Sequence, residues 1–110
     1  MKMAKAAYWQ RGESLDYVNG GSTVIEANTI IDLGTRIGIA GTDINPGEKG
    51  SLHVTGVYEI QKTGAAEIAM GAAVYFDGTG ITAATGGTPA GYAAAKAEAD
   101  ATVILVKLLG

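Results

Sequence analysis

One stretch of the 110-residue sequence, AGTDINPGEKGSLHV from Ala40 to Val54, contains the residue types of a phosphate-binding loop. A Walker loop needs Gly, four residues and then Gly-Lys-Ser or Gly-Lys-Thr, and it leads from a strand into a helix. Here Glu48 intrudes before Lys49, and Gly50 stands where a hydroxyl would hold magnesium. The tripeptide NPG is instead typical of a β-turn, because Pro fixes φ and Gly accepts the left-handed region. The stretch therefore predicts a turn and no nucleotide-binding site.

The remaining polar residues form no catalytic or metal-binding pattern. His53 is the only histidine and the chain has no cysteine, so neither a histidine cluster nor a thiolate site can hold a metal. The aspartates lie mostly beside turns, and Ser14 and Ser22 have no base or orienting acid close in sequence. We therefore expect no catalytic residue, no metal, no cofactor and no small-molecule substrate, and we predict that the protein is not an enzyme.

Composition limits the partners that the chain can have. A net charge of -3 and a sequence pI near 4.9 argue against nucleic acid, which needs clustered Lys and Arg. No apolar stretch reaches the length of a membrane span or of a secretory signal, so we expect a soluble protein made in a reducing cytoplasm. The apolar content depends heavily on alanine, which predicts a thin core that a partner subunit would reinforce.

Short runs of β-branched and aromatic residues recur between glycine-bearing turns, and this pattern predicts an all-β fold. Gly34-Thr35 suits a tight hairpin loop, and the run from Leu52 to Ile60 is predicted as one strand with a bulge at Gly56. Residues 95–101 are either a helical turn or a loop, and we favour the loop. No internal repeat is evident. We predict one small β-barrel or β-sandwich-like domain over residues 11–110, with strands at residues 30–33, 36–40, 52–60, 73–76, 81–84, 90–94 and 102–108.

Residues 1–10 show neither strand alternation nor a helix cap, and they predict a flexible N-terminal arm. The arm carries Lys2 and Lys5, followed by Tyr8 and Trp9. The two aromatic residues either pack on their own domain or anchor a partner surface, and we favour the partner contact over one made by the loop at residues 95–101.

The C-terminal run from Val103 to Leu108 is apolar on both faces. One face can fill the core of the subunit, and the other then needs cover from a second sheet or a second subunit. Val103 and Leu105 are therefore the candidate residues of a subunit interface.

Taken together, the segments AAYWQRGESLDY, GTRIGIAGTDINPGEKGSLHVTGVYEIQK, GAAVYFDGTGITA, GYA and TVILVKL resemble the small phage capsid cement, or head decoration, proteins, which are often mislabelled as RecA-like recombinases. The resemblance spans nearly the whole chain. It implies a subunit that binds the major capsid protein on the outer surface of an assembled phage head, commonly as a homotrimer, and stabilises the shell. No catalytic residue accompanies that function.

Two other functional classes remain open at the level of sequence. One is a β-rich binding module of the virion, such as a head fibre or adhesin piece that recognises a host-surface ligand, and aromatic residues gathered on one exposed face would favour it. The other is a small hydrolase or ATPase with a site assembled from distant residues, which a nucleotide-binding assay would reveal.

Overall fold

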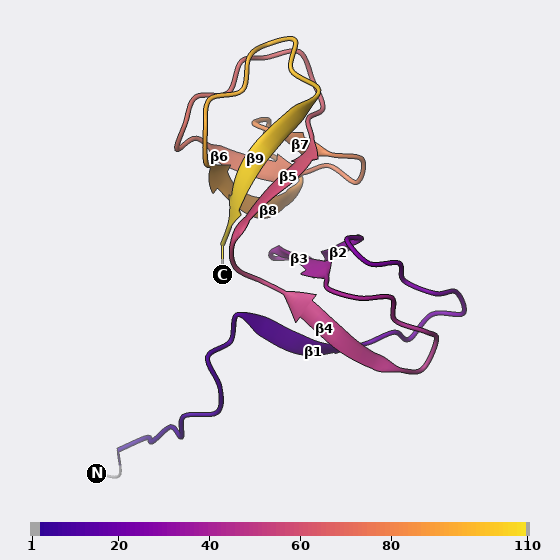
Figure 1. Ribbon diagram of the computed structural model, residues 1–110. Coiled ribbons are helices and arrows are strands. Elements are labelled where there is room, and N and C mark those ends of the chain that lie inside the picture. Colours follow the sequence, from indigo (N-terminus) through magenta and orange to yellow (C-terminus); the bar gives the residue numbers. More distant parts are fainter. Residues whose placement is uncertain (1–2, 110) are drawn as a thin grey trace.

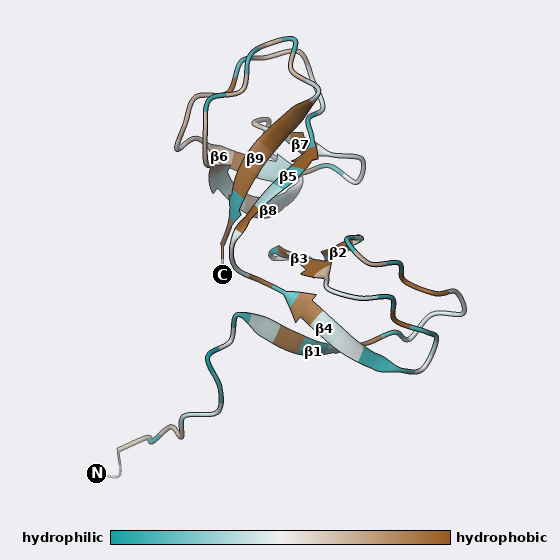
Figure 2. Ribbon diagram, in the orientation of Figure 1, coloured by the Kyte–Doolittle hydropathy of each residue, from teal (hydrophilic) through white to brown (hydrophobic). Residues whose placement is uncertain are grey.

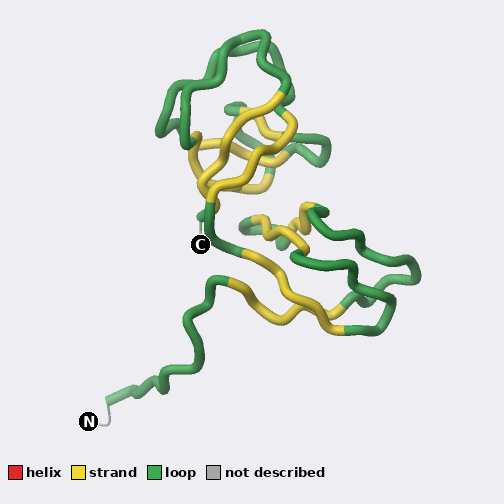
Figure 3. Tube along the Cα trace, viewed as in Figure 1, coloured by secondary structure: helices red, strands yellow, loops and turns green. Residues whose placement is uncertain are grey.

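Two antiparallel sheets make up the computed structural model, which describes residues 3–109 (Figure 1). The first sheet has the order β1-β4-β3-β2, with β1 (Ser14–Val18), β2 (Ile30–Asp32), β3 (Ile37–Ala40) and β4 (Lys49–His53). The second has the order β5-β9-β8-β6-β7, with β5 (Val57–Gln61), β6 (Ala73–Phe76), β7 (Ile81–Thr82), β8 (Thr88–Ala93) and β9 (Val103–Leu108). The described range contains no helix (Figure 3), and neither sheet closes into a barrel. The predicted all-β fold is confirmed.

Turns formed by the predicted residue types connect several of the predicted elements. β2 and β3 form a hairpin in which the N–H of Leu33 donates to the carbonyl of Arg36, and Gly34 has the positive φ of 89° that a type II′ turn requires of its second residue. The strand predicted at residues 73–76 coincides with β6, and the segment at residues 95–101 is a loop as favoured.

The predicted strand from Leu52 to Ile60 is wrong, because the chain leaves one sheet and enters the other within it. β4 ends at His53 and β5 begins at Val57, with Gly56 at a φ of 109° between them. The N–H of Val54 donates to Glu13 beside the first sheet. The carbonyl of Gly56 instead accepts from Leu108 in the second sheet. Residues expected to share one face of a strand therefore belong to different sheets.

The main core lies against the second sheet and includes residues of the first. Ile37 and Ile39 of β3 are buried together with residues of the second sheet and its loops, namely Ile60, Ile68, Val74, Ile81, Ala90, Ala93, Ala97, Ile104, Val106 and Leu108. The hydroxyl of Thr88 also donates to the carboxylate of Asp32 at 2.8 Å, across the two sheets. Figure 2 shows apolar residues on β3 and along β9, in the two sheets that share this core.

The two sheets repeat one strand arrangement. The order β1-β4-β3-β2 corresponds to β5-β9-β8-β6, with β7 as an addition at the edge of the second sheet. The strand registers correspond as well: Ile30 faces Ile39 as Ala73 faces Tyr92, and Ala40 faces Leu52 as Ala93 faces Val106. We call residues 13–54 the first repeat and residues 56–108 the second repeat.

Hydrogen bonds outside the strands follow the same correspondence. Ile25 and Ile44 exchange two backbone hydrogen bonds, and Ile68 and Ala97 exchange two in the second repeat. The bonds from Gly41 to Ser51 and from Val54 to Glu13 recur as bonds from Ala94 to Leu105 and from Leu108 to Gly56. Such agreement in sequence-distant bonds shows that the chain contains two versions of one structural unit.

The two buried polar residues among those described are also counterparts. The backbone N–H of Asn19 donates to Glu48, and that of Lys62 donates to Thr102. The Asn19 side chain donates to the carbonyls of Thr23 and Ile44, and the Lys62 ammonium donates to those of Gly64 and Ala99. At the same position of each repeat, a buried polar side chain therefore donates hydrogen bonds to loop carbonyls.

Candidate interaction surfaces

The N-terminal arm is the most exposed apolar feature of the described chain. Residues 3–13 form no strand or helix and extend away from the first sheet (Figure 1). Tyr8 and Trp9 are 80% and 89% exposed, so neither ring packs on its own domain. Lys5 is also exposed, whereas Lys2 lies outside the described residues. A pair of aromatic rings in solvent is a costly surface for a monomer and is typical of an interaction site.

A second apolar surface lies on the outer face of the second sheet. The register places Val57, Glu59 and Gln61 of β5 beside Lys107, Leu105 and Val103 of β9, and Tyr92 of β8 beside Lys107. We call these residues the outer face. Val103 and Leu105 are 43% and 41% exposed, and Val57 and Tyr92 are exposed beside them. The structure therefore places the two candidate interface residues together and adds Val57 and Tyr92, which only the pairing of β5 and β8 with β9 brings beside them.

The glycine-rich stretch is a turn that leads into a strand. The N–H of Glu48 donates to the carbonyl of Asn45 at 3.0 Å, and Gly47 has a φ of 80°, as a type II turn requires of its third residue. The N–H of Gly47 already donates to Asn19, and Lys49 begins β4 with its ammonium 3.9 Å from the carboxylate of Asp16. These contacts leave the stretch without the inward-pointing amides of a phosphate loop.

The titratable residues have structural surroundings. His53 lies on β4 with its ring against Gly41, where any added Cβ would collide with it. The pKa of Asp77 is held below its ordinary value by the Thr63 hydroxyl and by the N–H groups of Gly80 and Thr79. Between residues 3 and 109, no three His, Asp or Glu side chains gather as they would around a metal ion. Asp77 closes a turn, as the dipeptide Asp-Gly predicted.

The loop that was the alternative contact is held in place from both sides. Lys96 lies 3.6 Å from Glu67 and 3.4 Å from Glu98, and the Lys62 ammonium donates to the carbonyl of Ala99 at 3.2 Å. This loop is thus tied to the neighbouring loop at residues 63–72 and differs from the arm, whose described residues 3–10 are all exposed. No helix that could cross a membrane occurs in the described part of the chain.

A family model described as phage cement protein matches residues 9–108. The chain belongs to this family. It is a structural protein of the phage capsid, and its family is not one of enzymes. The match begins at Trp9, so Lys2 and Lys5 lie outside the matched residues. Neither the curated proteins nor the solved structures contain a match to the chain.

Membership of the phage cement family gives the exposed surfaces a context. Family proteins associate with the phage capsid, and the virion is therefore where this chain is found. The resemblance found in the sequence segments is confirmed by the match over most of the chain.

Proposed function

We propose that this cement protein binds the outer surface of the assembled capsid through its N-terminal arm and stabilises the shell without any chemical activity. The observation that carries this proposal is the solvent exposure of Tyr8 and Trp9 on a segment whose described residues 3–10 are all exposed. Aromatic side chains bury a large area and lose few rotamers when they dock, so they suit a contact that forms only on a preformed surface. Lys2 and Lys5 add positive charge to an otherwise acidic chain and would favour an acidic patch on the major capsid protein.

In this proposal the copies associate as a homotrimer through Val103 and Leu105, and each trimer presents several arms at once. Linked weak contacts bind far more tightly than single ones, because each arm after the first binds at a high local concentration. The subunits are made in the host cytoplasm and join the capsid after its assembly.

Capsids that lack the protein provide the test. Deleting residues 1–7 removes Lys2 and Lys5 and should weaken co-sedimentation with such capsids, because the charge attraction is lost. Separately, Trp9→Ala should reduce co-sedimentation about tenfold or more, because a central aromatic anchor is lost. Thermal unfolding of the free protein should be unchanged. Met70→Ala removes an exposed apolar side chain from a loop and is the matched control. Full capsid binding by both arm variants would move the contact to the loops or to the outer face.

The alternative of a host-ligand binding module finds little support in the distribution of aromatic residues. Tyr92 is the one strongly exposed aromatic residue on the outer face, and the other two strongly exposed rings lie on the arm, within the described residues. Binding of the purified protein to host cells that carry no virion would favour this alternative.

A further inference from the structure

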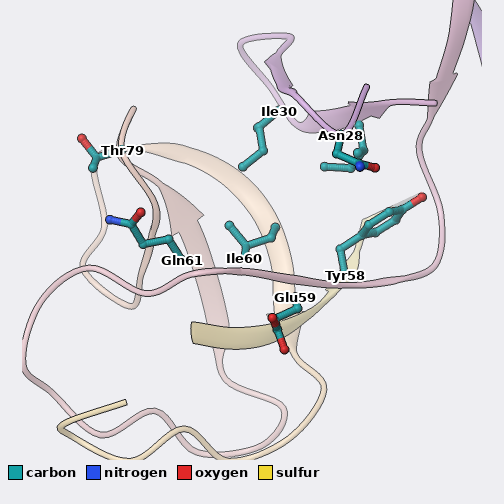
Figure 4. A pocket seen from close by; sticks show the side chains of 8 residues that line it. Asn28, Ile30, Tyr58, Glu59, Ile60, Gln61 and Thr79 are labelled. Atoms are coloured by element: carbon teal, nitrogen blue, oxygen red, sulfur yellow. The ribbon is translucent and has the colours of Figure 1, made fainter. Parts of the chain in front are cut away.

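The two repeats pack on each other through a contact that we call the joint. Although the two sheets are equivalent, each contributes a different face to the joint. Ile37 and Ile39 of the first repeat, with Ile30 beside them, form what we call the docked face of the first sheet. It packs against the face of the second sheet that carries Tyr58 and Ile60, which we call the inner face. Figure 4 shows Ile30 and Ile60 pointing toward one another across a cavity of about 290 Å³, which Ile39 and Tyr58 also line.

Each of these faces has a counterpart in the other repeat. Strand register makes the outer face of the second sheet equivalent to the docked face of the first, with Tyr92 in the place of Ile39 and Ala73 in the place of Ile30. In the same way, the first sheet carries an equivalent of the inner face. Its residues Leu15, Tyr17, Ile31 and Leu33 correspond, in that order, to Tyr58, Ile60, Val74 and Phe76 of the second repeat. We call this the open face.

Both unmatched faces leave apolar side chains exposed, although the outer face also carries Glu59, Gln61 and Lys107. On the open face, Leu15 and Leu33 are 41% and 40% exposed, whereas their counterparts Tyr58 and Phe76 are partly buried against the core. Across the outer face, the counterpart of the buried Ile39 is Tyr92, which is 46% exposed. Each repeat thus has the two halves of the joint, and one half of each repeat keeps exposed apolar side chains within residues 3–109.

We propose that the outer face of one copy packs on the open face of the next copy, so that the joint between the two repeats inside a chain is repeated between chains. The contact is head-to-tail, and it joins two different surfaces, so it generates a ring when the rotation closes. A trimer closed in this way would carry first and second repeats alternately around its axis. This inference rests on the self-association proposed above and specifies its two surfaces, but it does not depend on where the capsid is contacted.

The internal joint predicts which residues meet. Because Ile39 and Tyr58 line one cavity, their counterparts Tyr92 of one copy and Leu15 of the next should be neighbours. Val103 and Leu105 correspond to Lys49 and Ser51, which stay exposed beside the internal joint, so they should lie at the edge of the contact between copies.

Cysteine cross-linking tests this pairing without interference, since the chain has no cysteine of its own. Tyr92→Cys and Leu15→Cys are prepared with different tags, mixed, and treated with a short bismaleimide. A cross-linked dimer carrying both tags is expected in the mixture, and neither variant should couple to itself. Met70→Cys mixed with Leu15→Cys is the matched control and should give none, because Met70 lies on a loop outside both faces. Coupling of Tyr92→Cys to itself would show a symmetric contact between outer faces and would overturn the proposal.

Complementation gives a second, independent measurement. Tyr92→Glu and Leu15→Glu each place a charge in one half of the contact, so each variant alone should self-associate about tenfold or more weakly than the parent. An equimolar mixture should form dimers in sedimentation equilibrium, because each variant keeps the half that the other lacks. Unimpaired assembly of Leu15→Glu, with its circular dichroism unchanged, would overturn the proposal, as would a parent that stays monomeric both at millimolar concentration and on the capsid. Capsid co-sedimentation of the same variants separates this result from the arm contact.

Discussion

Asp77 shows how much structure a single carboxylate organises at the end of β6. It accepts the Thr63 hydroxyl at 2.6 Å and the N–H groups of Thr79 and Gly80 at 2.9 Å. These bonds favour the charged carboxylate and lower its pKa below the ordinary value of 3.8. Since the folded pKa is depressed, the stabilisation is present above the ordinary value and is lost as the pH falls through the folded one.

Replacing Asp77 with Asn tests this linkage, because the amide keeps an oxygen acceptor and loses the charge. We expect the parent to melt at a higher temperature than Asp77→Asn at pH 7. The difference should shrink as the pH is lowered below 3.8, where the parent carboxyl becomes protonated. Melting curves followed by circular dichroism between neutral and acidic pH measure both effects. A difference that stays constant over this range would mean that the charge of Asp77 contributes nothing.

Sequence patterns predicted the Asp77 turn but not the matched roles of Asn19 and Lys62. A turn depends on neighbouring residues, so Asp-Gly between two apolar runs is enough to recognise it. Asn19 and Lys62 perform one structural task with different chemistry, one with an amide and the other with an ammonium. Ile44 and Gly50 likewise correspond to Ala97 and Ile104, so the larger side chain changes place between the repeats. Substitutions of this kind erase the similarity of residue types while the backbone bonds persist.

At the scale of elements, periodicity located most strands but could not show where one sheet ends. Leu52, Val54, Tyr58 and Ile60 alternate as in a continuous strand, and all four are at least half-buried. The break between β4 and β5 depends on partners that are distant in sequence, since Val54 bonds to Glu13 and Gly56 to Leu108. The same limit hid the candidate interface beyond Val103 and Leu105, because Val57 and Tyr92 join it only through strand pairing.

Gly91 is the element-scale position where a single methyl group should be least tolerated. It lies in β8 with a φ of 144°, and a Cβ there would collide with the carbonyl oxygen of Lys107 in β9. The colliding atom is backbone within a paired strand, so it cannot move without breaking the sheet. We expect Gly91→Ala to lower the free energy of unfolding by about 2–4 kcal/mol, as measured by urea denaturation.

Gly20→Ala is the matched control for this substitution. No atom lies within 4 Å of a Cβ built at Gly20, and its φ is outside the left-handed region. Its free energy of unfolding should remain within about 0.5 kcal/mol of the parent. If Gly91→Ala were equally mild, β8 and β9 would pair more loosely than the register indicates.

At the scale of the whole molecule, the two repeats share one core and should therefore unfold together. The side chains of Ile37 and Ile39, in β3 of the first sheet, are buried in the core of the second. Thr88 of the second sheet donates a hydrogen bond to Asp32 of the first. A first repeat that loses these contacts keeps only the smaller cluster around Ile44 and Leu52, which is too small a core to be stable alone.

Ile39→Ala tests this coupling directly. Ile39 is 3% exposed, so truncation leaves a cavity in the joint and should lower the free energy of unfolding by about 2–5 kcal/mol. Because the joint belongs to both repeats, the variant should still unfold in one transition by intrinsic fluorescence and by circular dichroism alike. Val18→Ala, which truncates an exposed residue of the same sheet, should change the free energy by no more than about 0.5 kcal/mol. Two separate transitions in the parent, or a first repeat that stays folded after the second has melted, would show that the joint does not unite the chain. The proposed contact between copies would then no longer be supported by an equivalent contact inside the chain.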